Sequence, residues 1–268
     1  MKLHINISLE EFNAEGSLEF LAGEGLKPEL YLSGPELEAL STENISRMRE
    51  RLDSFGLFPI TLHAPFHDLN PGATDGDIRD LSLRKISKAI SLGSEMPVLG
   101  IVVHSGYNDW YYDFDVSKWL SVAVPSFSSL AEEAAMVGTK VFVENIFERN
   151  PDNLLELKRK VGHEGLLFCF DPGHGHLFSD LSLVSWYQSL SPYLGEIHLH
   201  DNCGKRDDHL PLLEGCINFQ EIIGEIFEGE GDPVFTLEPH TYEHAVRTLE
   251  NFRKICREIS GGTSKGVS

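Results

Sequence analysis

The sequence predicts a single (β/α)8 barrel, and three observations lead to this fold class. Short runs rich in β-branched and aromatic residues alternate along the chain with segments of helical periodicity. There are eight such runs in the 268 residues, which is the number of βα units that closes a parallel sheet into a barrel. No glycine-rich phosphate-binding turn follows the first run, which counts against the alternative, an open doubly wound sheet.

The predicted strands differ in strength, and the second is the weakest because it is short and lies between Pro28 and Gly34. The predicted strands are residues 3–7, 30–32, 59–63, 100–104, 140–144, 167–171, 196–200 and 234–238. Helical spacing is clearest at 81–92, 130–137, 154–161, 219–227 and 244–259. One domain is therefore expected over residues 1–260, followed by a flexible tail at 261–268.

Composition and charge restrict the expected partners. The net charge is −20 at pH 7, so the chain repels phosphate backbones at long range and nucleic acid is not the expected partner. There is no apolar run long enough to span a membrane and no secretory signal. The four cysteines are scattered and form no CxxC pair, which is typical of reduced thiols in a cytoplasmic protein. The sequence predicts no particular oligomeric state.

The longest predicted connections follow the third strand (64–80) and the fourth strand (105–116), and long loops inside a compact domain are often functional. The second of them is rich in aromatic residues, including Tyr107 and Trp110. These rings are candidates for stacking on a sugar ring or for forming a lid. The alternative is that they form a small satellite core under the loop.

Side chains of the metal-binding type stand at or just after the ends of six predicted strands. In a parallel barrel these ends meet at one face, where active sites form. Independent strand caps would use Ser, Thr and Asn as often as His, Asp and Glu, so the coincidence predicts a divalent metal site for Zn, Mn, Co or Fe. No Cys stands at these ends, which argues against a structural thiolate site. The candidate side chains are His63, His104, Glu144, Asp171, His174, His198, Asp207, Asp208, His209 and Glu238.

A metal ion also accounts for the segment FDPGH. Carboxylates that converge without a cation repel one another, which raises their pKa values. The Pro-Gly pair predicts a tight turn, so that the side chains of Asp171 and His174 reach the same small volume. His200 shares a strand face with His198 and is a candidate extra ligand, although a supporting role is the simpler interpretation.

Seven short segments of the chain, taken together, resemble the xylose isomerase-like barrel superfamily. This superfamily includes sugar isomerases, sugar epimerases and the endonuclease IV family. Each segment is short, but their order and spacing over residues 2–257 are specific. The segments are HAPF, VVHSG, VFVEN, FDPGH, HLHDN, DDHLPLLEG and LEPH. The resemblance implies a metal-dependent enzyme that acts on a small carbohydrate, with one to three ions of Zn, Mn or Co.

Resemblance to sugar epimerases of the tagatose epimerase type implies one metal ion held by Glu144, Asp171, His198 and Glu238. In these enzymes the two Glu residues also move a proton at the carbon beside a carbonyl, which makes Glu144 and Glu238 the implied catalytic residues. The same resemblance implies that His174 contacts the substrate.

Two further places in the sequence can be compared with the epimerases and with xylose isomerase. An Arg follows the seventh strand in the epimerases, and Lys205 and Arg206 lie near that place, out of register, as candidates for substrate binding. The match to xylose isomerase itself is poorer, because Ile146 stands two residues after Glu144 where that enzyme has Lys.

Resemblance to the endonuclease IV family implies three zinc ions held by nine ligands. Their counterparts here are all the candidates given above except Asp208. Such a cluster activates a hydroxide and holds a phosphate for in-line attack. The acidic chain and the short loop between His198 and Asp207 fit a small phosphoester better than DNA.

Three hypotheses therefore stand. The first, and the one that we prefer, is a metal-dependent isomerase or epimerase of a small sugar or sugar phosphate. The second is a zinc-cluster phosphoesterase, and the third is a metal-binding protein without catalysis. The extra histidines fit either of the first two, as groups that support the ligands or as ligands themselves.

Overall fold

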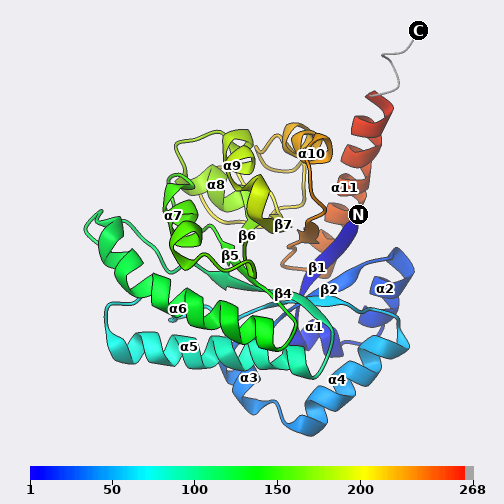
Figure 1. Ribbon diagram of the computed structural model, residues 1–268. Helices are drawn as coiled ribbons and strands as arrows, with labels where there is room; N and C mark the ends of the chain where they lie inside the picture. Colours follow the sequence, from blue (N-terminus) through cyan, green and yellow to red (C-terminus); the bar gives the residue numbers. More distant parts are fainter. Residues whose placement is uncertain (263–268) are drawn as a thin grey trace.

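The computed structural model describes residues 1–262, which form one closed barrel of parallel strands. Neighbouring strands pair in chain order, and β1 pairs with β8 to close the sheet. Figure 1 shows the helices arranged around these strands. The predicted (β/α)8 fold class is confirmed. The strands are β1 (Lys2–Ser8), β2 (Lys27–Tyr31), β3 (Ile60–His63), β4 (Val98–His104), β5 (Val141–Glu144), β6 (Leu166–Phe170), β7 (Leu194–Leu199) and β8 (Val234–Leu237).

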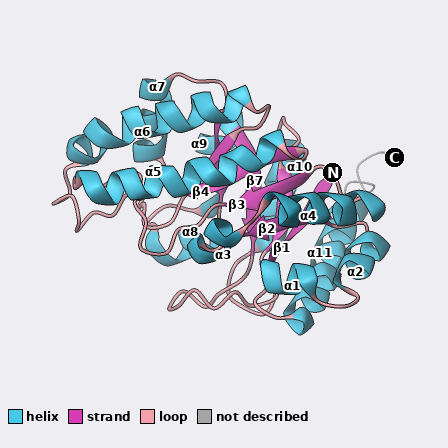
Figure 2. Cartoon of the chain, turned by 90° about the horizontal axis from the view of Figure 1, so that it is seen from below, coloured by secondary structure: helices cyan, strands magenta, loops and turns pink. Residues whose placement is uncertain are grey.

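The helices cover the outside of the barrel, and the view from below shows the strands enclosed by them (Figure 2). Short 3₁₀ turns, η1 (Leu92–Ser94) and η2 (Ser191–Tyr193), precede β4 and β7. Within residues 1–262 the helices are α1 (Leu9–Asn13), α2 (Ser17–Glu24), α3 (Gly34–Ala39), α4 (Thr42–Ser54), α5 (Gly76–Ser91), α6 (Val116–Met136), α7 (Asp152–Val161), α8 (Pro172–Phe178), α9 (Leu183–Leu190), α10 (Phe219–Glu228) and α11 (Tyr242–Gly262).

Predicted and observed strands agree closely, and the second strand is the main exception. The sequence predicts it at 30–32, but β2 begins at Lys27 and buries Pro28, Glu29 and Leu30. Glu29 faces the barrel interior, where its carboxylate accepts a hydrogen bond from another strand, so an apolar pattern could not reveal this part of the strand.

Helices are predicted less completely than strands. Helix α6 begins at Val116 rather than at Leu130, because Trp119 and Phe127 continue its buried face through Pro125. Helices α1, α3 and α4 are missing from the prediction, although each begins with a capping box. A Ser followed three residues later by Glu or Asn is the sequence signal that marks these helix starts.

The predicted end of the domain, residue 260, falls inside α11, which continues to Gly262. The first two residues of the predicted tail therefore belong to this helix, and the rest of the tail lies outside the described residues. No helix within residues 1–262 combines the length and the apolar character that crossing a membrane requires.

Phe142 of β5 fills the barrel interior below Glu144, where two other strands carry glycine. A Cβ atom at Gly100 or Gly195 would lie only 2.0 Å or 2.4 Å from a carbon of the Phe142 ring. The ring packs with Val102 and Cys169 in a small interior cluster, separate from the larger apolar core of buried residues. The two glycines therefore provide the space for the ring that fills the barrel.

Replacing Gly195 with Ala is expected to destabilise the protein by about 1–3 kcal/mol, because the new methyl group must displace the Phe142 ring. Gly224→Ala in α10 is a matched control, since a Cβ there would meet no atom within 4 Å. That variant is expected to be neutral or slightly stabilising. Chemical unfolding of both variants measures the difference, and equal stabilities would mean that the interior accommodates the methyl group.

Candidate metal centre

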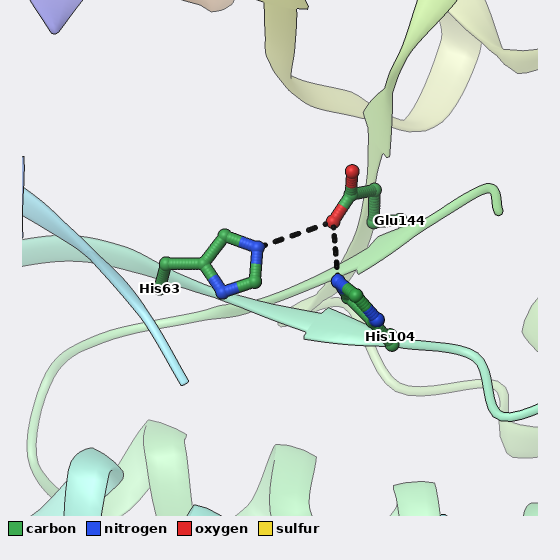
Figure 3. A group of neighbouring side chains, drawn as sticks. All are labelled: His63, His104 and Glu144. Atoms are coloured by element: carbon green, nitrogen blue, oxygen red, sulfur yellow. Dashed lines mark hydrogen bonds and ion pairs between the residues drawn. The ribbon is translucent and has the colours of Figure 1, made fainter. Parts of the chain in front are cut away.

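Strands β3, β4 and β5 each end in a side chain that faces one point at the mouth of the barrel. Glu144 Oε2 lies 3.3 Å from His63 Nε2 and 3.2 Å from His104 Nε2 (Figure 3). The strands are parallel, and the register pairs His104 with Glu144, which brings these strand ends together. We call His63, His104 and Glu144 the first ligand group.

The second ligand group consists of Glu144, Asp171, His198 and Glu238. Glu144 contributes its other oxygen, Oε1, which lies 3.4 Å from His198 Nδ1. His198 Nδ1 is also 3.4 Å from Glu238 Oε2. Potential ligand atoms of Glu144, Asp171 and His198 all lie within 4.8 Å of one another. Glu144 therefore connects the first and second groups, with one carboxylate oxygen facing each.

The third ligand group, His174, Asp207 and His209, lies nearer the rim. Asp207 Oδ2 is 3.2 Å from both His174 Nε2 and His209 Nε2. His209 has a φ of 45°, a left-handed conformation that costs a non-glycine residue about 1–3 kcal/mol. A loop keeps such a residue only where the surrounding contacts hold it, and here they direct the ring toward Asp207.

Helix α8 explains how Asp171 and His174 reach adjoining groups. The predicted tight turn is wrong in detail: Asp171 is the N-cap of α8, and its carboxylate accepts the backbone N–H of His174 at 2.9 Å. Pro172 occupies the first helical position, which its fixed φ favours. One helical turn thus places Asp171 in the second group and His174 in the third.

The structure brings all nine predicted ligands into these three adjoining groups, and their binding of metal stays a prediction. His200 joins them. Its Nε2 lies 3.0 Å from Asp171 Oδ2, and its ring stacks on that of His209 with 3.9 Å between centroids. Because His200 touches both the second and the third group, it is placed either to bind an ion or to orient the side chains that do.

The hydrogen bonds of His63 and His209 are compatible with a cation inside each of their ligand groups. His63 Nδ1 lies 2.9 Å from the Ala64 carbonyl and His209 Nδ1 lies 3.0 Å from the Glu238 carbonyl, so each neutral ring donates there. Their Nε2 lone pairs then face carboxylate oxygens, and two facing acceptors require a proton or a metal ion between them. Among the described residues, the buried atoms His198 Nδ1 and Glu238 Oε2 lack a hydrogen-bond partner. This set of donors suits Zn, Mn or Co.

A carboxylate that the sequence analysis did not identify supports His198 from below. His198 Nε2 lies 3.3 Å from each oxygen of Glu29, and both side chains are fully buried. Asn6 donates a further hydrogen bond to Glu29 at 2.8 Å. A neutral His198 therefore carries its proton on Nε2 and directs the Nδ1 lone pair toward Glu144 and Glu238.

The carboxylates of the site raise the pKa values of two of its histidines, His198 and His209. Burial lowers the pKa of His198, but the surrounding carboxylates outweigh burial and hold that pKa well above its usual value. Burial is likewise outweighed at His209, where the hydrogen bond to Asp207 helps to raise the pKa to about 9. Protons and metal ions would therefore compete for these nitrogens, and metal affinity is expected to fall as the pH is lowered.

A cavity of ≈ 640 Å³ opens above the three ligand groups. This volume suits a small-molecule ligand. Within residues 1–262 no Lys or Arg lines the cavity, whereas Glu10 and Glu11 do. Apart from the ligands and these two acids, it is lined by Asn6, Ser8, Ala14, Tyr31, Phe66, His67, Pro239 and His240.

The aromatic residues predicted to bind substrate do not line this cavity, whereas His174 does. Tyr107 is buried, donates its hydroxyl to Asp109 at 2.7 Å and stacks on Tyr112. Trp110 is 75% exposed. Tyr107 therefore packs into the main apolar core, neither into the cavity nor into a separate satellite core. The role of Trp110 stays a prediction.

Lys205 and Arg206 do not line the cavity either. Both are exposed, and Arg206 Nε lies 3.5 Å from Asp208 Oδ1. Their part in substrate binding likewise stays a prediction.

Glu148 is a buried carboxyl close to the centre that belongs to none of the ligand groups. It accepts hydrogen bonds from the Ser105 hydroxyl and, at 2.7 Å, from the Ile146 N–H. Burial raises its pKa from 4.5 to about 7. The folded state thus binds the Glu148 proton more tightly than the unfolded state does, and this proton binding stabilises the fold. That stabilisation is complete below pH 4.5 and is lost as the pH rises through 7.

Glu148→Gln is expected to reduce the loss of stability between pH 5.5 and 8 by about 2 kcal/mol. The reason is that a buried Gln amide is neutral at every pH, whereas the buried Glu148 carboxyl ionises as the pH rises through about 7. The amide oxygen of Gln can still accept the hydrogen bond from the Ser105 hydroxyl. Urea unfolding of both proteins at the two pH values measures the change. An unaltered pH dependence would mean that Glu148 is not the titrating group.

The fold is a (β/α)8 barrel, and its three ligand groups form a candidate metal centre at the carboxyl ends of the strands. The chain belongs to the family of xylose isomerase-like TIM barrels, whose family model matches residues 29–259. The resemblance found in the sequence is thereby confirmed.

Individual relatives extend this comparison. MJ1311, an uncharacterised protein of Methanocaldococcus jannaschii, is 31% identical over 228 residues, which cover 82% of this chain and 78% of that protein. A solved structure described as a D-tagatose 3-epimerase-like protein is 26% identical, with a TM-score of 0.84 over 98% of this chain and 100% of that chain. A Thermus thermophilus protein, TTHB071, solved after soaking with ZnCl2, is 23% identical, with a TM-score of 0.81 over 96% and 99% of the two chains. At this last identity the likeness shows the fold alone.

Proposed function

We propose that the protein is a divalent-metal-dependent isomerase or epimerase of a small carbohydrate. The second ligand group carries this proposal: Glu144 and Glu238 each place an oxygen 3.4 Å from His198 Nδ1, and both line the cavity. This arrangement supports one cation between two carboxylates that also face the space for substrate. The 26% identity to a D-tagatose 3-epimerase-like protein supports the same class of activity.

A bound divalent metal would polarise the oxygens of the substrate and acidify the C–H beside its carbonyl group. In the proposal, Glu144, Asp171, His198 and Glu238 hold that ion. One of the two Glu carboxylates removes the proton from one face of the sugar, and the other returns a proton to the opposite face, which inverts the carbon. The hydroxyl of Tyr31 and other polar groups of the cavity wall are placed to bind sugar hydroxyls.

The cavity favours an uncharged sugar over a sugar phosphate. A phosphate group needs cationic or N–H donors, and no Lys or Arg within residues 1–262 lines the cavity. Glu10 and Glu11 add negative charge at its wall, which opposes a phosphate further. We therefore expect a ketose without phosphate to be the better substrate.

A second candidate function, hydrolysis of a small phosphoester, is favoured by the first and third ligand groups. An epimerase with one ion does not need them, whereas a three-ion centre would use both. Each oxygen of Glu144 faces two imidazoles, which supports a bridging carboxylate more than a free base. In that case the ions themselves would bind the phosphate.

Proton exchange distinguishes these candidates directly. Protein purified without chelator or nickel is incubated in D2O with a panel of ketoses, their phosphates and small phosphodiesters, and its metal content is measured by elemental analysis. An epimerase incorporates deuterium beside the carbonyl of a ketose and contains about one ion per chain. Hydrolysis of a phosphodiester with two or three zinc ions, and no deuterium exchange, would reject the first candidate and support the second.

His104→Ala separates the candidates by a single substitution. His104 belongs only to the first ligand group, so an enzyme with one ion in the second group should retain that ion. A three-ion enzyme should lose about one ion per chain, because the first group would keep only His63 and Glu144. Elemental analysis of the variant beside the unaltered protein measures the difference.

A further inference from the structure

The loop after β7 carries Asp207 and His209, and the two ends of this loop are held against each other. The Cys216 N–H donates to the Asn202 carbonyl at 2.9 Å. The Asp201 carboxylate accepts the backbone N–H of Gly215 at 3.0 Å and that of the residue after Cys216 at 3.1 Å. Residues 201–202 therefore lie beside 215–217, and this contact closes the neck of the loop.

Two of the four cysteines stand at this neck. Cys203 follows Asn202 directly, while Cys216 is the residue whose N–H Asn202 accepts. The pKa of Cys203 is raised, and the neighbouring Cys216 thiol is the largest cause. Both residues are exposed, whereas Cys169 is buried and Cys256 is partly buried. The neck thus brings together two thiols that solvent reaches.

We propose that Cys203 and Cys216 are the site of a reversible intramolecular disulfide that closes the ligand-bearing loop. With oxidised glutathione as oxidant, one thiolate attacks the glutathione disulfide and releases one reduced glutathione. The second thiolate then displaces the other glutathione from the mixed disulfide. The pair loses two electrons and two protons, and two reduced glutathiones are formed. Exposed, reversible bonds of this kind are typical of redox-responsive thiols.

The bond would restrain the loop without entering the metal centre. The ring encloses residues 204–215, which include the third-group ligands Asp207 and His209. Cross-linking the two ends of the loop reduces its freedom to open when no ion holds Asp207 and His209 together. Lys205 and Arg206 are exposed within this ring, so trypsin cleavage reports how often the loop opens.

Peptide mass spectrometry tests the bond itself. The full chain is treated with oxidised glutathione, its remaining thiols are alkylated, and it is digested without reduction. The proposal expects a Cys203–Cys216 linked peptide, which disappears after reduction and is absent in C203S and C216S. C256S is the matched control and should keep the linkage. Glutathione retained on either cysteine, links between chains, or two freely alkylated thiols would overturn the proposal.

Limited trypsin digestion tests the effect on the loop. In chelator-treated protein, the oxidised form should be cleaved after Lys205 or Arg206 about tenfold more slowly than the reduced form. Any fragments cut there should stay joined on a non-reducing gel. Equal cleavage rates in a sample whose disulfide is proven would overturn the restraining role. Neither measurement uses activity, so both results are independent of the function proposed above.

Discussion

Glu144→Gln should lower the rate of deuterium exchange by at least about a thousandfold, and should remove the ions of the first and second ligand groups. Glu144 is the carboxylate that these groups share, with Oε2 between His63 and His104 and Oε1 beside His198. Gln keeps the shape but offers one acceptor oxygen and no charge, and its amide N–H2 would face imidazole nitrogens. An ion in the third group, which does not contain Glu144, should remain bound.

Metal analysis and exchange kinetics of the same preparation check this expectation. Glu148→Gln is the matched control, because Glu148 is also a buried acid, lies in the loop that follows Glu144 and belongs to none of the ligand groups. It should keep both the ions and the activity. If Glu144→Gln retained its ions and exchanged protons at the normal rate, both the second ligand group and the proposed function would be rejected.

The sequence predicts the main part of this site because strand ends are easy to recognise in a parallel barrel. His63, His104 and Glu144 each close a short apolar run, and parallel pairing alone brings such ends together. The (β/α)8 fold follows from the same runs. Asp207 and His209 lie in a loop instead, so their position after the seventh strand indicates the face of the barrel but not that the two side chains meet.

Residues inside the barrel were harder to predict, for a physical reason. Apolar periodicity identifies the strand face that packs against the helices, but part of the interior of this barrel, below the ligands at its mouth, is polar. The buried Glu29, Thr61, Glu196 and Thr236 lie there, and Thr61 and Thr236 both donate to Glu196. In β2 the apolar run 30–32 therefore excluded Glu29, because a charged residue does not fit the pattern of a buried strand.

The sequence also did not predict the direction in which side chains of the loops point. Tyr107 turns into the main apolar core instead of the cavity, where its hydroxyl donates a hydrogen bond to Asp109 and its ring stacks on Tyr112. His209 reaches Asp207 through a left-handed backbone, and only a tertiary contact selects that conformation for a histidine. Composition and spacing do not contain such information.

Glu29→Gln is expected to weaken metal binding about 10- to 100-fold, although Glu29 contributes no ligand to the three groups. The Glu29 carboxylate accepts a hydrogen bond from His198 Nε2–H at 3.3 Å, which keeps the Nδ1 lone pair free to face Glu144 and Glu238. A Gln amide that donates to Nε2 would place the ring proton on Nδ1 instead, where it blocks the ion. Competition with a chelator measures the affinity, and nitrogen chemical shifts of the metal-free histidines report the tautomer.

Glu196→Gln separates this orienting role from the cost of disturbing a buried carboxyl. Glu196 is equally buried in the barrel interior, and burial, together with the nearby Glu29, holds its pKa well above the usual value. The raised pKa favours the neutral form of this carboxyl, and the neutral amide of Gln is a close substitute for that form. This variant should bind metal as the unaltered protein does. If the two variants lost affinity equally, the interior carboxyls would act through packing; if neither lost affinity, Glu29 would not set the tautomer of His198. Loss confined to Glu29→Gln, with similar thermal stability in both variants, assigns the orientation of His198 to Glu29.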